Sequence, residues 1–412
     1  MPMGNLLCSS AMLLSGCSPV KAVNFLRAIN IVTFSKNTYY RFQRLYILPA
    51  INRSWEYKQA ALLKEVQGRD VTAGGDGRCC SPGHTAVYGS YSVMDLETSK
   101  ILDMQLVKVT EVKNSYWMEL EGLKRCFAKI LSSGVSIKTF VTDRHTQIKK
   151  FMRDDQQEIT HYFDIWHVGK ASSGGRAEEC REKWLSVVNH VANVHTGHGD
   201  IFKECAHGPL DDRDWIKKGS RLHKEFKEIV ASNGLITDIG RLSPVAQTYS
   251  LESYHKVVIY FAPKSVHFTY PAMKGRILLS VLHFNENCKR KQAVTKSGEE
   301  QWTVSYMKYG NGNAITKEVK TPITYGIVQD CLVEVMKMRE EFPTMEEAAA
   351  NMEKINSNLP PNVCDGFEKK EKAVVVAARK SRFQKGAELA KSWAPERKGK
   401  RIRKPSRRLM DR

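Results

Sequence analysis

Residues 136–143 read SIKTFVTD, and this short stretch decides how the middle of the chain is expected to fold. β-Branched and aromatic side chains fill it, Gly134 stands just before it, and Asp143 comes at its end. Such a composition, bounded by turn-forming residues, is typical of a strand inside a sheet. The sequence therefore predicts a strand over 136–142 that brings the carboxylate of Asp143 to one edge of that sheet.

The segments on both sides of this strand supply the rest of a sheet and its helices. Upstream, residues 116–131 carry apolar side chains at helical spacing, and three earlier stretches have the composition of strands. The predicted elements, in chain order, are strands at 71–76, 87–94 and 101–109, a helix at 116–131, a strand at 136–142, a short helix through Ile148 and Met152, and a strand at 159–163. This order is that of an RNase H-like fold of the α/β class, in which helices cover a mixed sheet.

The remainder of the chain divides into segments of different character. Helical patterns at 178–194 and 220–230 interrupt the sheet as an inserted subdomain, and Pro360 and Pro361 mark the end of the folded body. The predicted divisions are a helical, helix-turn-helix-like segment at 1–65, the first part of the RNase H-like core at 66–167, a helical insertion at 168–243, the rest of the core with C-terminal helices at 244–365, and a basic disordered tail at 366–412.

The charge of the chain is concentrated at its C-terminal end. Residues 368–412 hold 17 Lys and Arg against 5 Asp and Glu, so they carry +12 of the total net charge of +20. Such a tail on a mildly basic body favours a polyanionic partner, although a solvated extension without a specific partner is the alternative. The cluster RKGKRIRK at 397–404 has the composition of a nuclear import signal, which predicts a nuclear location.

Cysteine usage and hydropathy argue against export and against a membrane. The ten cysteines lie scattered without a CxxC pair, as expected for a protein of a reducing compartment. The LSGC string at 14–17 resembles a lipoprotein signal, but no Lys or Arg precedes Lys21. No apolar run approaches the roughly 20 residues that span a bilayer. We expect no membrane partner.

A predicted helix at 36–48, capped by Ser35 and ended by Pro49, is a candidate for DNA recognition. Cationic and hydrogen-bonding side chains crowd its first turns, as on a helix that enters a DNA groove. An ordinary packing subdomain is the alternative. The predicted DNA-binding residues are Lys36, Asn37, Arg41 and Arg44 on this helix, with Arg78 and Arg144 next to two candidate catalytic acids.

Three acidic residues, far apart in sequence, fall where this fold would bring them together. Asp76 and Asp143 are predicted at the ends of neighbouring strands, and Glu252 on a helix after the insertion. Converging carboxylates of this kind hold two divalent metal ions for phosphoryl transfer, and the glycines beside Asp76 would let metal and phosphate approach closely. Any one of these acids alone could be a surface or capping group, as Asp143 could be at the start of a helix.

Two further polar clusters are candidates for a site. Asp164 or His167, after the strand at 159–163, either supports the metal site or orients DNA; the alternative is an ordinary Asp at a strand end and a buried His whose hydrogen bonds are satisfied. His195, His198, Cys205 and His207 suggest zinc, whose usual ligands are Cys and His, but their spacing matches no standard zinc motif.

Five strings in this order resemble a Kolobok-type cut-and-paste transposase of animal genomes, over roughly residues 4–383. They are GDGRC at 75–79, SPGH at 81–84, TDRH at 142–145, DIWH at 164–167 and SLESYH at 250–255. The resemblance implies an RNase H-like catalytic domain, Mg²⁺ or Mn²⁺, a nuclear location and insertion at TTAA targets. It also implies that Asp76, Asp143 and Glu252 are the catalytic, metal-binding triad and that Asp164 and His167 form an accessory motif.

The expected function is thus that of a DNA transposase core, which cleaves and joins DNA strands with a metal cofactor. Its partners would be the double-stranded terminal repeats of a transposon and a TTAA target, and the active form would be a homo-oligomer. The alternative is a catalytically inactive, transposon-derived nuclear DNA-binding protein. Nicking activity in a divalent metal separates the two hypotheses.

Overall fold

The computed structural model describes most of the chain, in two compact units, residues 1–361 and 362–412. The described residues are 2–81, 86–164, 177–208, 210, 212–242, 247–306, 314–356, 359–362 and 371–380. His167 and most of the predicted tail lie outside them. Residues 372–380 are helical, which differs from the disorder predicted for 366–412.

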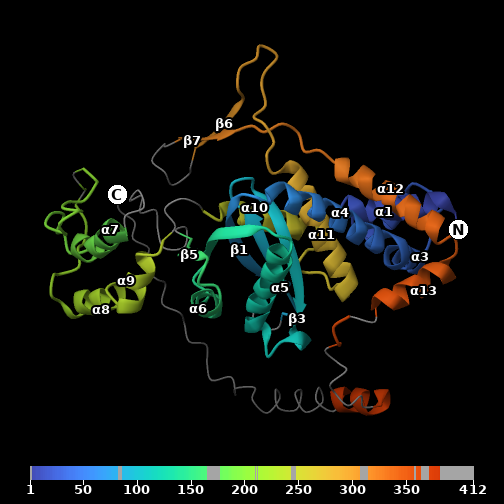
Figure 1. Cartoon of the computed structure of the whole chain (residues 1–412), viewed down its shortest axis with the longest axis horizontal. Helices are drawn as coiled ribbons and strands as arrows, with labels where there is room; N and C mark the ends of the chain where they lie inside the picture. Colours follow the sequence, from blue (N-terminus) through green and yellow to red (C-terminus); the bar gives the residue numbers. More distant parts are fainter. Residues whose placement is uncertain are drawn as a thin grey trace, which may run out of the picture. The chain divides into compact units, whose positions relative to one another are not determined.

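A five-stranded mixed sheet lies at the centre of the first unit (Figure 1). Its strands are β1 (Asp70–Cys79), β2 (Tyr88–Asp95), β3 (Lys100–Lys108), β4 (Ser136–Thr142) and β5 (Thr160–Phe163), in the spatial order β3-β2-β1-β4-β5. The pairs β1–β2 and β2–β3 are antiparallel, whereas β1–β4 and β4–β5 are parallel. Parallel neighbours need crossover connections, and α5 (Met118–Ser132) and α6 (Thr146–Asp155) provide them. The predicted order of strands and helices is confirmed.

Helices cover both faces of the sheet. One core joins α5 to the sheet, with Phe127 edge-on to Phe140 at a centroid distance of 4.8 Å. The other core joins the opposite sheet face to α4 (Leu48–Val66), α10 (Tyr249–Phe261), α11 (Tyr270–Asn287) and α12 (Gly326–Glu341). Successive strand residues point to opposite faces, so in β2 Val93 belongs to the first core and Met94 to the second. The α/β class of the fold is therefore confirmed.

The N-terminal segment is helical, but its predicted end at Pro49 is wrong. After α1 (Met3–Leu14) and α2 (Pro19–Ala28), helix α3 (Lys36–Phe42) passes through a π-helical turn (Gln43–Ile47) straight into α4. Proline can stand in the first turn of a helix, where its missing N–H costs little. Pro49 occupies that position in α4, and the change to π-helical hydrogen bonding just before it allows the helix to continue.

The insertion is built from α7 (Ala177–His190), α8 (Arg221–Val230) and α9 (Asn233–Ile239). Between α7 and α8, the described residues of 191–220 contain no helix or strand, only an isolated bridge between Thr196 and Glu204. The chain then returns to the sheet, where the N–H of Phe163 donates to the carbonyl of Arg241 at 2.9 Å.

The C-terminal part of the first unit adds a hairpin that the sequence did not predict. Its strands are β6 (Trp302–Tyr306) and β7 (Ala314–Glu318), and α13 (Met345–Asn356) follows α12 (Figure 1). Every residue of both strands is exposed, so no alternation between buried and exposed positions marked them in the sequence. Among the described residues, no helix has the length and apolar character required to cross a bilayer.

Candidate functional site

Asp76 lies in the middle of β1, so its predicted position at the end of that strand is wrong. The antiparallel ladder with β2 pairs Asp76 with Ser92 and continues beyond it. The parallel ladder with β4, in contrast, stops at the pair Gly74–Val141. Asp76 and Asp143 each lie two residues beyond that last pair. The two acids are therefore equally far from the end of the ladder. At this level β1 continues as a strand, whereas β4 has already ended.

Asp143 directly follows β4, as predicted, and its side chain is exposed. Its Oδ1 accepts a hydrogen bond from the backbone N–H of His145 at 3.2 Å, just before α6 begins at Thr146. The carboxylate thus takes part in the turn into that helix, which is the local role that Asp often has. One hydrogen bond leaves its other oxygen able to bind a further group.

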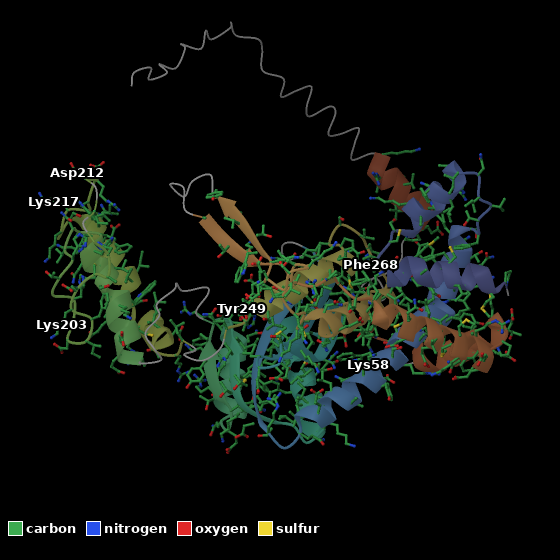
Figure 2. The ribbon with its side chains drawn as sticks, turned by 90° about the horizontal axis from the view of Figure 1, so that it is seen from above. Lys58, Lys203, Asp212, Lys217, Tyr249 and Phe268 are labelled. Atoms are coloured by element: carbon green, nitrogen blue, oxygen red, sulfur yellow. The ribbon has the colours of Figure 1, made fainter. Side chains whose placement is uncertain are left out.

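Glu252 stands in the first turn of α10 and is also exposed. Helix α10 packs against α11 and contacts β1, the strand that carries Asp76. Tyr249, the first residue of α10, is labelled in Figure 2, at the point where the chain comes back from the insertion. The helix thus brings Glu252 toward the strand of Asp76 although 176 positions separate the two in sequence.

The carboxyl group of Asp76 is electrostatically coupled to the other candidate acids. Its pKa is raised from 3.8 to about 8, first by burial, then by the negative charges of Asp143, Glu119 and Glu252, while the N–H of Gly77 acts in the opposite direction. Like charges held together disfavour ionisation. A cation among these groups would remove that penalty.

Glu119 is a fourth acid of this cluster that the sequence did not single out. It lies in the first turn of α5, and burial and the charge of Asp143 raise its pKa to about 7. A Cβ on Gly77 would come within 2.6 Å of the Glu119 side chain, so these two residues are in close contact. In the sequence Glu119 is an ordinary acid at a helix start, and only the packing of α5 on β1 reveals it.

Buried polar atoms without a hydrogen-bond partner surround these acids. They are the hydroxyl of Tyr91, both ring nitrogens of His145 and Nε2 of His255. Such atoms are uncommon in native proteins unless an ion, water or substrate completes them. Their presence fits a site that binds a further polar group.

Two histidines flank the cluster. His255 Nδ1 lies 3.6 Å from Asp76 Oδ2, and burial together with Arg78 and Lys264 lowers the pKa of His255 to about 4. His145 Nε2 lies 3.6 Å from Glu119 Oε2. Burial lowers the pKa of His145 as well, although Asp143 opposes this. Both rings are therefore neutral near pH 7 and do not compensate the negative charge.

Asp164, one of the two predicted accessory residues, is buried at the end of β5. Its Oδ2 accepts hydrogen bonds from the hydroxyl and, at 3.4 Å, from the backbone N–H of Thr248, the residue before α10. Its own N–H donates to the carbonyl of Thr142 at 2.8 Å. Asp164 thus ties the start of the helix that carries Glu252 to the end of the strand that leads to Asp143.

The residues predicted to bind DNA fall into two groups. Lys36, Asn37, Arg41 and Arg44 are all exposed on α3 and the π-helical turn. Arg144 instead donates two hydrogen bonds to Asp238 of the insertion, and Arg78 is only 7% exposed and faces the carbonyl of Ala262 at 3.5 Å. These interior and paired positions do not favour the DNA contacts predicted for Arg78 and Arg144.

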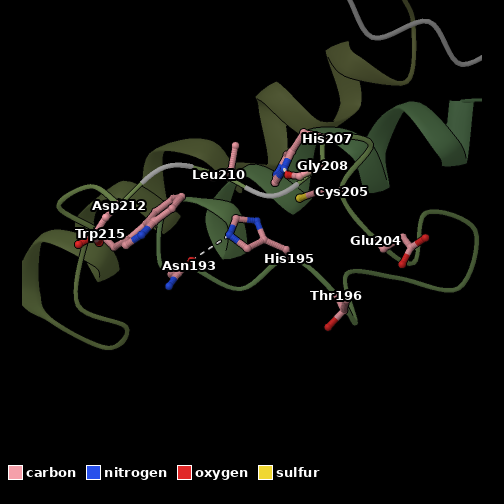
Figure 3. Close-up of a pocket in the computed structure, with 10 residues that line it drawn as sticks. All are labelled: Asn193, His195, Thr196, Glu204, Cys205, His207, Gly208, Leu210, Asp212 and Trp215. Atoms are coloured by element: carbon pink, nitrogen blue, oxygen red, sulfur yellow. Dashed lines mark hydrogen bonds between the residues drawn. The ribbon is translucent and has the colours of Figure 1, made fainter.

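A second polar cluster lies in the insertion, at an open hollow of about 520 Å³ (Figure 3). One donor atom from each of His190, His195, Cys205 and His207 lies within 4.8 Å of the other three. Among the described residues this is the only group of His, Cys, Asp or Glu that converges so tightly, and the predicted acids form no such group. His190 was not singled out in the sequence. His198, which was, lies just outside the cluster, with its Nε2 3.2 Å from Cys205 Sγ.

No model of a known protein family and no curated protein matches this sequence.

Proposed function

We propose that this protein is the core of a metal-dependent DNA transposase with an RNase H-like catalytic domain, which cleaves and joins DNA strands. The observation that carries the proposal is that Asp76 and Asp143 each lie two residues beyond Gly74–Val141, the last pair of the parallel ladder between β1 and β4. Glu252 is the third catalytic residue because its charge acts on Asp76 from the helix that contacts the same strand. The proposed cofactor is Mg²⁺ or Mn²⁺, and the proposed location is the nucleus.

The oxygen donors of these three residues suit such a cofactor, although they form no tight ligand group in this structure. Asp76, Asp143 and Glu252 would hold it, with Glu119 as a further acid, because hard divalent cations prefer carboxylate oxygens. When bound, the metal would supply Lewis-acid stabilisation of the phosphate and activate the attacking oxygen. The raised pKa of Asp76 supports this assignment in part: burial is its largest cause, and the negative charges of Asp143, Glu119 and Glu252 add to it.

The protein's own groups would position the DNA. The exposed Lys36, Arg41 and Arg44 would bind phosphates away from the reacting bond, while Asn37 could read a base edge. The proposed substrates are terminal-repeat DNA and a TTAA target, bound by a homo-oligomer that uses two such sites.

The test is cleavage of duplex DNA that carries a terminal repeat next to TTAA, by the full chain in Mn²⁺. We expect Asp76→Asn, Asp143→Asn and Glu252→Gln each to lower cleavage by about two orders of magnitude or more, with DNA binding retained. Asp70→Asn is the matched control, because Asp70 is an exposed acid on the same strand. Cleavage that survives all three substitutions would refute the proposal.

The alternative function is DNA binding without catalysis. It is favoured by one observation: the predicted acids form no tight ligand group, whereas four DNA-binding candidates are exposed on one helical segment. Binding that weakens steeply with salt, together with no nicking in Mg²⁺ or Mn²⁺, would select this alternative.

A further inference from the structure

Two separations within the cluster of the insertion match those of a tetrahedral zinc site, and all four donor atoms lie within 4.8 Å of one another. His190 Nδ1 lies 3.3 Å from His207 Nε2 and 3.6 Å from Cys205 Sγ. Zinc bonds of about 2.0 Å to nitrogen and about 2.3 Å to sulfur, at tetrahedral angles, place two nitrogens about 3.3 Å apart and nitrogen and sulfur about 3.5 Å apart. The two separations in the structure agree with these values to within about 0.1 Å.

Hydrogen bonds on the outer side of two rings direct the inner nitrogens toward the cluster. The Nδ1–H of His207 can donate to the carbonyl of Gly208 at 2.8 Å, which leaves the lone pair of Nε2 directed at His190. The Nε2–H of His195 can donate to Oδ1 of Asn193 at 3.0 Å, and its Nδ1 is buried without a partner (Figure 3). Metal-binding histidines characteristically donate their other N–H to an oxygen in this way.

His198 is outside the group of four candidate ligands and contacts the sulfur of one of them, Cys205. The side-chain amide of Asn189 can donate to His198 Nδ1 at 3.2 Å, so the proton of His198 stands on Nε2, 3.2 Å from Cys205 Sγ. A donor at this distance stabilises a thiolate.

Hydrogen bonds, but no side chain of a hydrophobic core, hold the described part of the segment that carries three of these residues. None of the described residues of 191–220 is fully buried, and they form no helix or strand. Irregular loops longer than about 12–15 residues are uncommon in compact domains, and structural metals supply the stability that a small core cannot. The buried apolar cluster of the insertion, around Phe163 and Cys180, contains no residue of this segment.

We propose that His190, His195, Cys205 and His207 bind a zinc ion that fixes the fold of the insertion, independently of the acidic site. All four ligand positions are protein atoms, so the site is structural rather than catalytic. His198, Asn193 and Gly208 orient the ligands from outside.

The test is the zinc content of the full-length protein, purified without chelator and measured by mass spectrometry. We expect one zinc ion per chain, lost in Cys205→Ser and in His207→Asn. The matched controls Cys17→Ser and His267→Asn, both at exposed positions, retain it. Asp76→Asn also retains it, which separates this site from the acidic one.

Two measurements keep the test decisive if the ligand variants do not fold. Replacement of zinc by Co²⁺ in the wild type should give the charge-transfer absorption of a thiolate ligand, and His198→Gln should fold with zinc affinity lowered about 10- to 100-fold. Folded wild-type protein without stoichiometric metal, or equal zinc in Cys205→Ser and the wild type, would overturn the proposal and leave a hydrogen-bonded histidine cluster.

Discussion

Asp76→Asn should stabilise the metal-free protein and abolish its stabilisation by divalent metal. The carboxyl pKa is about 8 in the folded chain against an ordinary value of 3.8, because burial and three neighbouring acids oppose ionisation. Between these pH values the folded chain therefore holds a proton that the unfolded chain has released. Stability falls as pH rises through this window, since the folded state binds more protons. Asparagine does not titrate, so the variant does not lose stability as pH rises through this window.

The size of the effect follows from the same pKa. The interval from 3.8 to about 8, at about 1.4 kcal/mol per pH unit, sets a ceiling of about 6 kcal/mol for a fully buried group. The side chain of Asp76 is 33% exposed, so solvent screens part of the repulsion. We expect Asp76→Asn to gain about 2 kcal/mol at pH 8 and only about 0.5 kcal/mol at pH 5.

The assay is urea unfolding of the wild type, Asp76→Asn and the control Asp70→Asn, at pH 5 and pH 8, in chelator weak enough to spare bound zinc. Mn²⁺ should then raise the stability of the wild type and of Asp70→Asn, but not that of Asp76→Asn. Equal stabilities of wild type and Asp76→Asn at pH 8 without metal, or equal responses to Mn²⁺, would refute the reasoning.

Three further predictions concern the framework of the two sites. Gly75→Ala should lower the free energy of unfolding by about 1–3 kcal/mol in urea titration, because a Cβ there would lie 2.5 Å from atoms of two buried aromatic side chains. Asp238→Asn should lower it by about 1–3 kcal/mol at pH 7, because it breaks the ion pairs of a buried carboxylate with Arg144 and Lys149. Burial raises the pKa of Asp238, but the hydrogen bonds from Lys149 and Arg144 outweigh it and keep that pKa below its ordinary 3.8. The difference in stability between variant and wild type should therefore vanish as pH falls through the lowered pKa. Strong chelation should increase amide hydrogen exchange in residues 191–220 and leave exchange in the central sheet unchanged.

Local sequence patterns predicted the sheet well where a strand is buried. Residues 136–142 were predicted as a strand and form β4 with the same boundaries, because apolar and β-branched side chains fill it. The first strand was predicted only as far as Asp76, because the glycines around that residue have no side-chain pattern. It continues to Cys79 because β2 supplies an antiparallel partner. The exposed hairpin β6–β7 gave no signal at all.

The candidate sites show the same division. The sequence alone determined the order of strands and helices, the acids Asp76, Asp143 and Glu252 as candidates, and most of the Cys and His residues of the insertion, because these depend on residue type and on neighbours along the chain. Only the tertiary structure added Glu119 to the acids and His190 to the zinc candidates. Each joins its cluster through the packing or folding of a distant segment, and such convergence depends on strand register and long-range contacts, which local patterns do not encode.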